Sequence, residues 1–168
     1  QPLLITRIII AVNVFLFLWV TMGSTVLTNG GAINGRELDM ALSQYFIDNG
    51  EWYRLISSGF LHYGLIHVGM NMFLLWQLGQ LLETALERGR FALLHFAAMF
   101  GGSAGALALS PNALTGGASG AVFGLMAAAA VGLQQRGVNP MKTGIGGTLI
   151  LNLLITFTIP GISIGGQV

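Results

Sequence analysis

The sequence predicts an all-α polytopic membrane protein, because its composition is strongly apolar and its apolar residues gather in long runs. Hydrophobic residues make up 54% of the chain, charged residues only 8%, and the mean hydropathy is +0.74. A soluble domain carries about 25% charged residues, so this chain has too few charges to cover a water-facing surface. Backbone groups in lipid need partners inside their own segment, so we expect helices in a single domain, residues 1–168.

The apolar runs give the expected helices in order. A bilayer core of about 30 Å takes about 20 mostly apolar residues per helix. We therefore predict five complete transmembrane helices, at about residues 8–27, 65–82, 91–109, 118–133 and 145–159. A sixth begins near Ile162, and because the sequence ends at Val168 we expect the bundle to be truncated in that helix. The first run lacks a small-residue cleavage site and is interpreted as a retained span rather than a signal peptide.

The longest connection, residues 28–64, carries most of the polar side chains. Aromatic residues favour the membrane–water boundary, and this loop contains Trp52, Tyr53, Phe60 and Tyr63. We predict short helices lying in the interface, with an ordinary soluble loop as the alternative.

At the other end of the second run, Glu83 and Glu87 precede two arginines, and we expect both to form a solvated helix end.

The basic residues predict the orientation. With alternating spans, one side of the bundle receives Arg7, Arg88, Arg90, Arg136 and Lys142. The other side receives only Arg36 and Arg54, both in the 28–64 loop. Because Lys and Arg are enriched in cytoplasmic loops, we expect a cytoplasmic N-terminus and an outward-facing 28–64 loop.

Polar positions are expected at the outer ends of three separate helices, with Gln167 near the outer end of the sixth. Ser119 opens the fourth run, between glycines, in Gly117-Ala118-Ser119-Gly120. His67 and Asn71 open the second run, four residues apart on one helix face. Polar side chains at membrane depth face the bundle interior or a water-filled cavity. The pattern therefore favours nucleophilic chemistry inside a bilayer.

These motifs resemble the rhomboid intramembrane serine proteases of the six-helix bacterial type. The resemblance covers nearly the whole chain in order, through Trp52-Tyr53-Arg54, His62, the stretch 67–71, the stretch 117–120 and the stretch 162–166. It implies a rhomboid-like bundle in a bacterial inner (plasma) membrane. It also implies a serine endopeptidase that cuts transmembrane protein substrates near the outer membrane face.

The resemblance also implies a role for each site residue. Ser119 would be the nucleophile, and His67, Asn71 and the backbone N–H of Ser119 would form the oxyanion hole. Phe123 corresponds to an aromatic residue that packs against the base in some relatives. Gly117 and Gly120 allow close backbone approach, and Gly120 also belongs to a small-residue row suited to tight helix packing.

The expected histidine base falls at Gln167, where this sequence departs from the family pattern. An amide has no usable basic nitrogen near neutral pH. The departure is compatible with an inactive form, with a misassigned C-terminal sequence, or with a protease-dead relative that binds transmembrane client helices. A transporter or channel is the weakest alternative, because paired broken helices and a repeat are not evident.

Simpler interpretations stay open for each motif. Ser119 is compatible with helix packing, His67 with a hydrogen bond to a loop carbonyl, and Asn71 with hydrogen bonding between helices. Arg54 is compatible with an interfacial anchor, and His62 with a place at the loop boundary. The stretch 101–105 suits close packing of the third helix. The three histidines are dispersed and the chain has no cysteine, so we expect no metal and no cofactor. A net charge of +1 gives no reason to expect nucleic acid.

Overall fold

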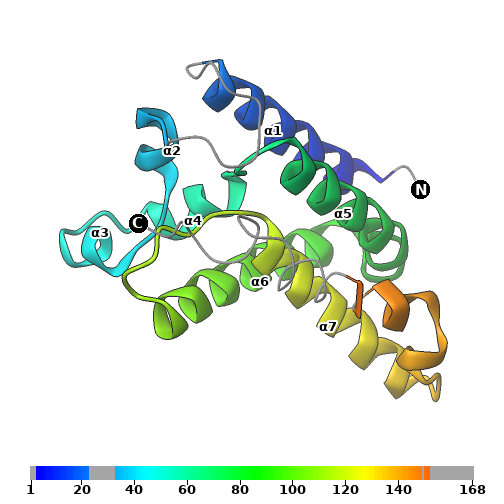
Figure 1. The fold of residues 1–168 in the computed structure, drawn as a ribbon. Coiled ribbons are helices and arrows are strands. Elements are labelled where there is room, and N and C mark those ends of the chain that lie inside the picture. Colours follow the sequence, from blue (N-terminus) through cyan, green and yellow to red (C-terminus); the bar gives the residue numbers. More distant parts are fainter. Residues whose placement is uncertain (1–2, 23–32, 149, 152–168) are drawn as a thin grey trace.

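The computed structural model describes residues 3–22, 33–148 and 150–151, and helices dominate them (Figure 1). Their order is α1 (Leu4–Thr21), α2 (Gly35–Met40), α3 (Gln44–Asp48), α4 (Arg54–Ser57), η1 (Ser58–Phe60), α5 (Leu65–Leu86), α6 (Arg88–Leu109), α7 (Ser119–Gln135) and η2 (Pro140–Lys142). Within the described residues the β-structure is one isolated bridge, between Leu42 and Thr115. The predicted all-α class is confirmed.

Three helices of the described part are long and apolar enough to cross a membrane: α1, α5 and α6. The fourth expected span corresponds to α7, which is apolar but has only 17 residues. Residues 144–148 and 150–151 are helical and open the fifth expected span, whose remainder lies outside the described residues. The start of the sixth, near Ile162, lies outside them as well.

The predicted start of the first span was late. Helix α1 begins at Leu4 rather than near Ile8, because Arg7 does not interrupt it. Arg7 is exposed, and its guanidinium lies 5.9 Å from the ring centroid of Trp76 in α5, a cation–π contact that a charged residue on a helix surface can make.

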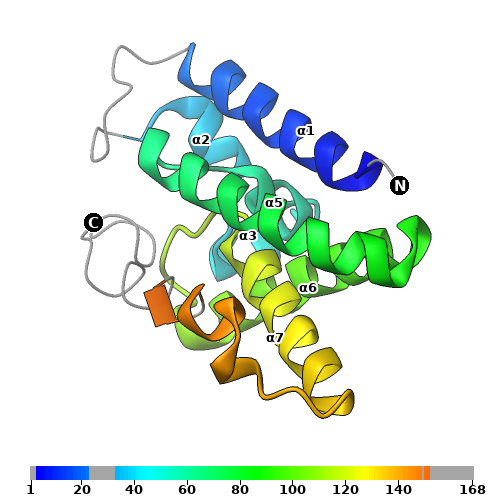
Figure 2. The same ribbon diagram turned by 90° about the vertical axis from the view of Figure 1, so that its right-hand side faces the viewer.

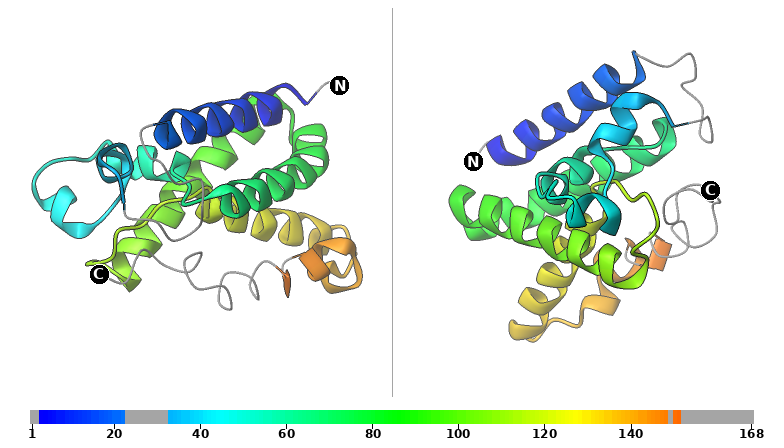
Figure 3. Two further views of the ribbon diagram at one scale, coloured as in Figure 1. Left: turned by 45° about the horizontal axis from the view of Figure 1, so that its top comes forward. Right: turned by 90° about the vertical axis from the view of Figure 1, so that its left-hand side faces the viewer.

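The short helices of the 28–64 loop gather at one end of the bundle, as the views from two sides show (Figures 1 and 3). Helix α2 begins with a capping box, in which Asn34 Oδ1 accepts from the Glu37 N–H and Glu37 Oε2 accepts from the Asn34 N–H. A small apolar cluster of Val20, Met40, Ala41 and Leu61 ties this region to α1. The short helices are as predicted, and their place in the membrane interface stays a prediction.

Helices α5 and α7 form the centre of the core. Helix α1 packs on α5, and α7 packs on both α5 and α6 (Figure 2). The core combines apolar side chains of four helices: Ile9, Phe17, Val68, Leu75, Leu78, Leu82, Phe91, Val122, Leu125 and Met126. Close packing of α6 and α7 depends on small residues, since a Cβ built on Gly124 would lie 2.4 Å from the Cβ of Ala98.

The expectation of a solvated Glu83 is wrong. Its side chain is buried and receives three hydrogen bonds from the start of α1: from the N–H of Ile5 at 2.9 Å, and from the N–H and hydroxyl of Thr6 at 2.9 and 2.6 Å. The first N–H groups of a helix have no partner within it, and a carboxylate there satisfies them. Only Glu87 is exposed, as expected.

Candidate active site

Ser119 is the first residue of α7, and the backbone before it is unusual. Gly117 has φ of +129°, a conformation that side-chain-bearing residues rarely adopt. Ala118 is the N-cap residue of α7 and has no side chain that could cap the helix. Within the described part of the chain, the N–H groups of Ser119 and Gly120 have no hydrogen-bond partner. The positive end of the helix is therefore open beside the serine hydroxyl.

The imidazole of His67 lies directly against this backbone. A Cβ built on Gly117 would stand 2.8 Å from Cε1 and 2.9 Å from Nε2 of His67. The ring is buried, and its Nδ1 accepts from the N–H of Tyr63 at 3.4 Å. Because Nδ1 acts as an acceptor, a neutral His67 carries its proton on Nε2, the atom nearer to Gly117. The glycine at 117 thus lets a donor nitrogen reach the peptide next to Ser119.

Asn71 lies one turn further along α5 and is also buried. Its Nδ2 donates to the carbonyl of His67 within the same helix, at 2.9 Å. An amide nitrogen has two N–H donors, so a second one stays available. The structure therefore brings His67 to the serine segment and gives Asn71 a bond that braces the turn carrying His67.

A cavity of about 330 Å³ opens beside Ser119. Its walls come from α6, α7 and the 28–64 loop, and include Leu42, Met99, Ser103, Leu109, Gly120 and Phe123. Gly117 and Phe123, two of the predicted packing residues, both line it. Most of these side chains are apolar, so the serine hydroxyl faces a space with few competing polar groups.

The segment that leads to Ser119 is held by the 28–64 loop, called the outer loop after its expected orientation. Leu42 and Thr115 exchange both backbone hydrogen bonds, at 2.8 and 2.9 Å, and the N–H of Gln44 donates to the carbonyl of Pro111 at 2.8 Å. The N–H of Gly117 donates to the carbonyl of Ser58 at 2.7 Å. The outer loop therefore determines where the serine segment lies.

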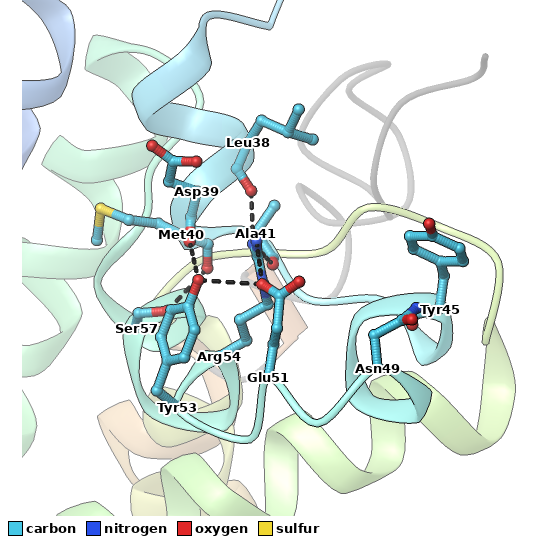
Figure 4. Close-up of polar contacts among 10 residues, drawn as sticks. All are labelled: Leu38, Asp39, Met40, Ala41, Tyr45, Asn49, Glu51, Tyr53, Arg54 and Ser57. Carbon is cyan, nitrogen blue, oxygen red and sulfur yellow. Dashed lines mark hydrogen bonds and ion pairs between the residues drawn. The ribbon is translucent and has the colours of Figure 1, made fainter.

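Arg54 braces the outer loop itself (Figure 4). Its guanidinium donates to the carbonyls of Leu38 and Ala41, at 2.5 and 2.8 Å, and forms an ion pair with Glu51 at 2.6 Å. The side chain is buried, unlike that of an interfacial anchor, so the alternative proposed for Arg54 is wrong. Ala41 precedes Leu42, which connects this brace to the bridge with Thr115.

Sequence reasoning placed His62 at the loop boundary and missed its burial. Its ring is 1% exposed and lies edge-on to His67, with centroids 5.2 Å apart. Its Nε2 lies 3.4 Å from the N of Ala118, at the residue before Ser119. Burial and, to a smaller extent, the neighbouring His67 lower the pKa of His62 to about 3, so the ring is neutral at physiological pH. In the sequence, the signal for it was its place in the family resemblance, together with the stretch 67–71.

The remaining predicted site position, Gln167, lies outside the described residues. The site as described therefore consists of Ser119, His67, Asn71, two backbone N–H groups and one apolar cavity. Fold and site together define a class: a polytopic helical membrane protein with a serine-centred polar site at the start of a core helix.

Comparisons with known proteins place the chain within that class. The Rhomboid domain family matches residues 49–167. Rhomboid protease GluP of Bacillus subtilis (strain 168) is 32% identical over 159 residues, which cover 92% of this chain and 31% of that protein. Rhomboid protease GlpG of Serratia proteamaculans (strain 568) is 40% identical over 85 residues, 50% of this chain and 28% of its own length. The chain belongs to the rhomboid family, and it spans about a third of the length of these relatives.

Proposed function

We propose that this chain is an intramembrane serine endopeptidase, with Ser119 as its nucleophile. The observation that carries the proposal is the approach of His67 Nε2 to the backbone at Gly117, two residues before Ser119. A serine, a buried imidazole donor and the open N-terminus of a helix meet there. The names of the relatives as rhomboid proteases support the same activity.

The chemistry follows from these groups. The Ser119 oxygen attacks a peptide carbonyl while a base removes the hydroxyl proton, and the carbonyl oxygen becomes an oxyanion. The N–H groups of Ser119 and Gly120, the Nε2–H of His67 and the second amide N–H of Asn71 are the donors for that charge. Fixed donors in a site with little water stabilise such charge strongly. The family pattern puts the proton acceptor at position 167, where the Gln167 amide has no basic nitrogen, so the step as written needs a histidine at that position.

The length of α7 supports cleavage within the membrane. At a rise of about 1.5 Å per residue, its 17 residues extend about 26 Å, less than a hydrocarbon core of about 30 Å. A helix that meets the cytoplasmic boundary at Arg136 therefore begins below the outer surface, and Ser119 is at that depth. Transmembrane protein substrates fit such a site, in a bacterial plasma membrane with the N-terminus in the cytoplasm.

A second candidate function is supported by Gln167. A rhomboid-like protein without its base would bind transmembrane client helices and release them uncut. The apolar cavity beside Ser119 suits this function equally well.

Labelling with a fluorophosphonate distinguishes the two functions, because the probe reacts with an activated serine. We expect little labelling of the full-length protein with Gln167. Gln167→His restores both labelling and cleavage of a transmembrane substrate, and adding Ser119→Ala abolishes both. We expect the activity of the Gln167→His form to depend on pH, because its histidine base titrates near neutral pH.

One outcome would contradict the base position, and another would contradict the protease proposal. Strong labelling with Gln167 in place means that another group activates the serine. Absence of recovery in a folded Gln167→His protein favours client binding. Loss of folding is excluded by comparing the unfolding midpoints of all forms.

A further inference from the structure

His62 is a buried polar group close to Ser119 that the proposed chemistry leaves without a role. It lies between η1 and α5, and the cavity beside Ser119 is lined without it in the described part of the chain. The ring is fully enclosed, and both of its nitrogens have partners. Because both ring nitrogens are bonded and the ring does not line the cavity, His62 can affect the site only through the groups that it binds.

The partners of His62 determine its tautomer. Its Nδ1 lies 3.2 Å from the carbonyl oxygen of Phe60, which can only accept, so Nδ1 carries the proton. Its Nε2 then has a free lone pair and accepts from the N–H of Ala118 at 3.4 Å. His67 has the opposite arrangement, with an accepting Nδ1 and a protonated Nε2.

Hydrogen bonds hold the two successive peptide N–H groups that precede Ser119. The N–H of Gly117 is held by the carbonyl of Ser58, and the N–H of Ala118 by His62. Both holding groups come from one short segment, residues 58–62, that lies before α5. The next two N–H groups, of Ser119 and Gly120, have no partner among the described residues. Residues 58–62 therefore bind the N–H groups of Gly117 and Ala118, which fixes the turn. The N–H groups of Ser119 and Gly120 face the site.

We propose that His62 is a positioning residue, whose Nδ1-protonated tautomer holds the Ala118 peptide and thereby places Ser119 against His67. The proposal rests on the reactive role of Ser119 proposed above. His62 touches no reacting atom. It determines the distance and orientation between the serine hydroxyl and the donors of the site.

Two substitutions separate the two nitrogens. His62→Asn keeps a donor at the δ position, toward Phe60, and removes the acceptor at the ε position. His62→Gln offers an amide oxygen near the ε position and can accept from Ala118. His95→Gln is the matched control: His95 is also buried, and its Nδ1 has no partner among the described residues.

The rate of fluorophosphonate labelling is measured for each substitution in the full chain carrying Gln167→His, beside the unfolding midpoint. We expect His62→Asn to slow labelling about five- to tenfold, the factor that one hydrogen bond corresponds to. His62→Gln recovers most of the rate, and His95→Gln leaves it unchanged apart from stability. Equal losses in both His62 variants, in proportion to their unfolding midpoints, overturn the proposal.

A spectroscopic measurement keeps the test independent of the reaction. The side-chain ¹⁵N shifts of His62 report which nitrogen is protonated, and the amide shift of Ala118 reports its acceptor. We expect a protonated Nδ1, and an Ala118 amide that moves in His62→Asn and returns toward the parent in His62→Gln. A protonated Nε2, or an unmoved Ala118 amide, overturns the proposal even if the parent chain proves unreactive. An unreactive parent with the expected shifts sustains the positioning role and overturns only the protease function.

Discussion

Gly102 of α6 and Gly120 of α7 meet through their backbones. A Cβ built on Gly102 would stand 2.5 Å from the Cα of Gly120, and one built on Gly120 would stand 2.8 Å from the Cα of Gly102. Gly120 follows Ser119 directly, so a close backbone contact between the two helices lies beside the proposed nucleophile. Any side chain at either position must push the start of α7 away from α6.

The first prediction concerns this contact. We expect Gly102→Ala to lower the free energy of unfolding by about 1–3 kcal/mol, the usual cost of overpacking, and to slow labelling of Ser119 in the Gln167→His chain. Gly101→Ala is the matched control, because a Cβ there meets nothing within 4 Å and alanine favours the helix. Tryptophan fluorescence in mixed micelles measures the unfolding of both variants, and the fluorophosphonate probe measures the labelling rate. Equal stability of the two variants would contradict the contact.

The second prediction concerns the buried carboxylate of Glu83. Glu83→Gln replaces one acceptor oxygen with an NH₂ group that faces the N–H donors of Ile5 and Thr6. Hydrogen bonds to charged groups contribute about 1.5–3 kcal/mol each, so we expect unfolding to become easier by at least about 2 kcal/mol. Glu87→Gln makes the same change at an exposed site and should leave the unfolding midpoint nearly unchanged. If both variants behave alike, Glu83 does not cap α1 in solution.

The third prediction concerns pH. The pKa of His62 is about 3 in the fold and about 6.5 in the unfolded chain, so the unfolded chain binds more protons between these values. Stability is therefore full above about pH 6.5 and falls with decreasing pH, by about 2 kcal/mol between about pH 6 and about pH 4.5. Comparing the protein with His62→Gln isolates this contribution from that of the adjacent His67. Parallel pH profiles of the two proteins would refute it.

The fourth prediction concerns the oxyanion donors. In the Gln167→His chain, we expect His67→Ala to lower turnover by about 10²–10³, the usual cost of losing one such donor. Asn71→Ala should cost less, because one of its N–H groups is already bound to the carbonyl of His67. Turnover of a transmembrane substrate is the measurement, with unfolding midpoints as the control. Unchanged turnover in both variants assigns these residues to structure.

The fifth prediction concerns orientation. Asp48 in the outer loop and Val138 after α7 are both exposed and can be replaced by cysteine in a chain that has none. We expect an impermeant thiol reagent to label Asp48→Cys in sealed cells, and Val138→Cys only after the cells are opened. Equal labelling of both in sealed cells would contradict a cytoplasmic N-terminus.

Features governed by local sequence were predicted well. The start of α5 at Leu65 and the end of α6 at Leu109 agree with the structure, because apolar runs end there in turn-forming residues. The contact between the Ser119 segment and His67 was expected from the matching depth of two helix ends and from the family resemblance. The close packing expected of the stretch 101–105 is confirmed at Gly102.

Features governed by distant partners were not predicted. Glu83 stands next to other charges in the sequence, and its real partners are the N–H groups of α1. His62 looks like a loop residue, while its acceptor nitrogen serves a peptide 56 positions later in the chain. The sequence left Arg54 open to interpretation as an interfacial anchor, because composition does not reveal backbone carbonyl partners such as that of Ala41. Buried polar groups are satisfied by tertiary contacts, and those contacts cannot be inferred from the spacing of residue types alone.

The pairing of Thr6 with Glu83 also sets an order of events during synthesis. The donor and its acceptor are 77 residues apart, and at about 5–20 residues per second the ribosome needs about 4–15 s to make that interval. Until then, the N–H groups of Ile5 and Thr6 at the start of α1 lack the carboxylate that they bind in the fold. The contact between the start of α1 and Glu83 can therefore form only after most of α5 has been made.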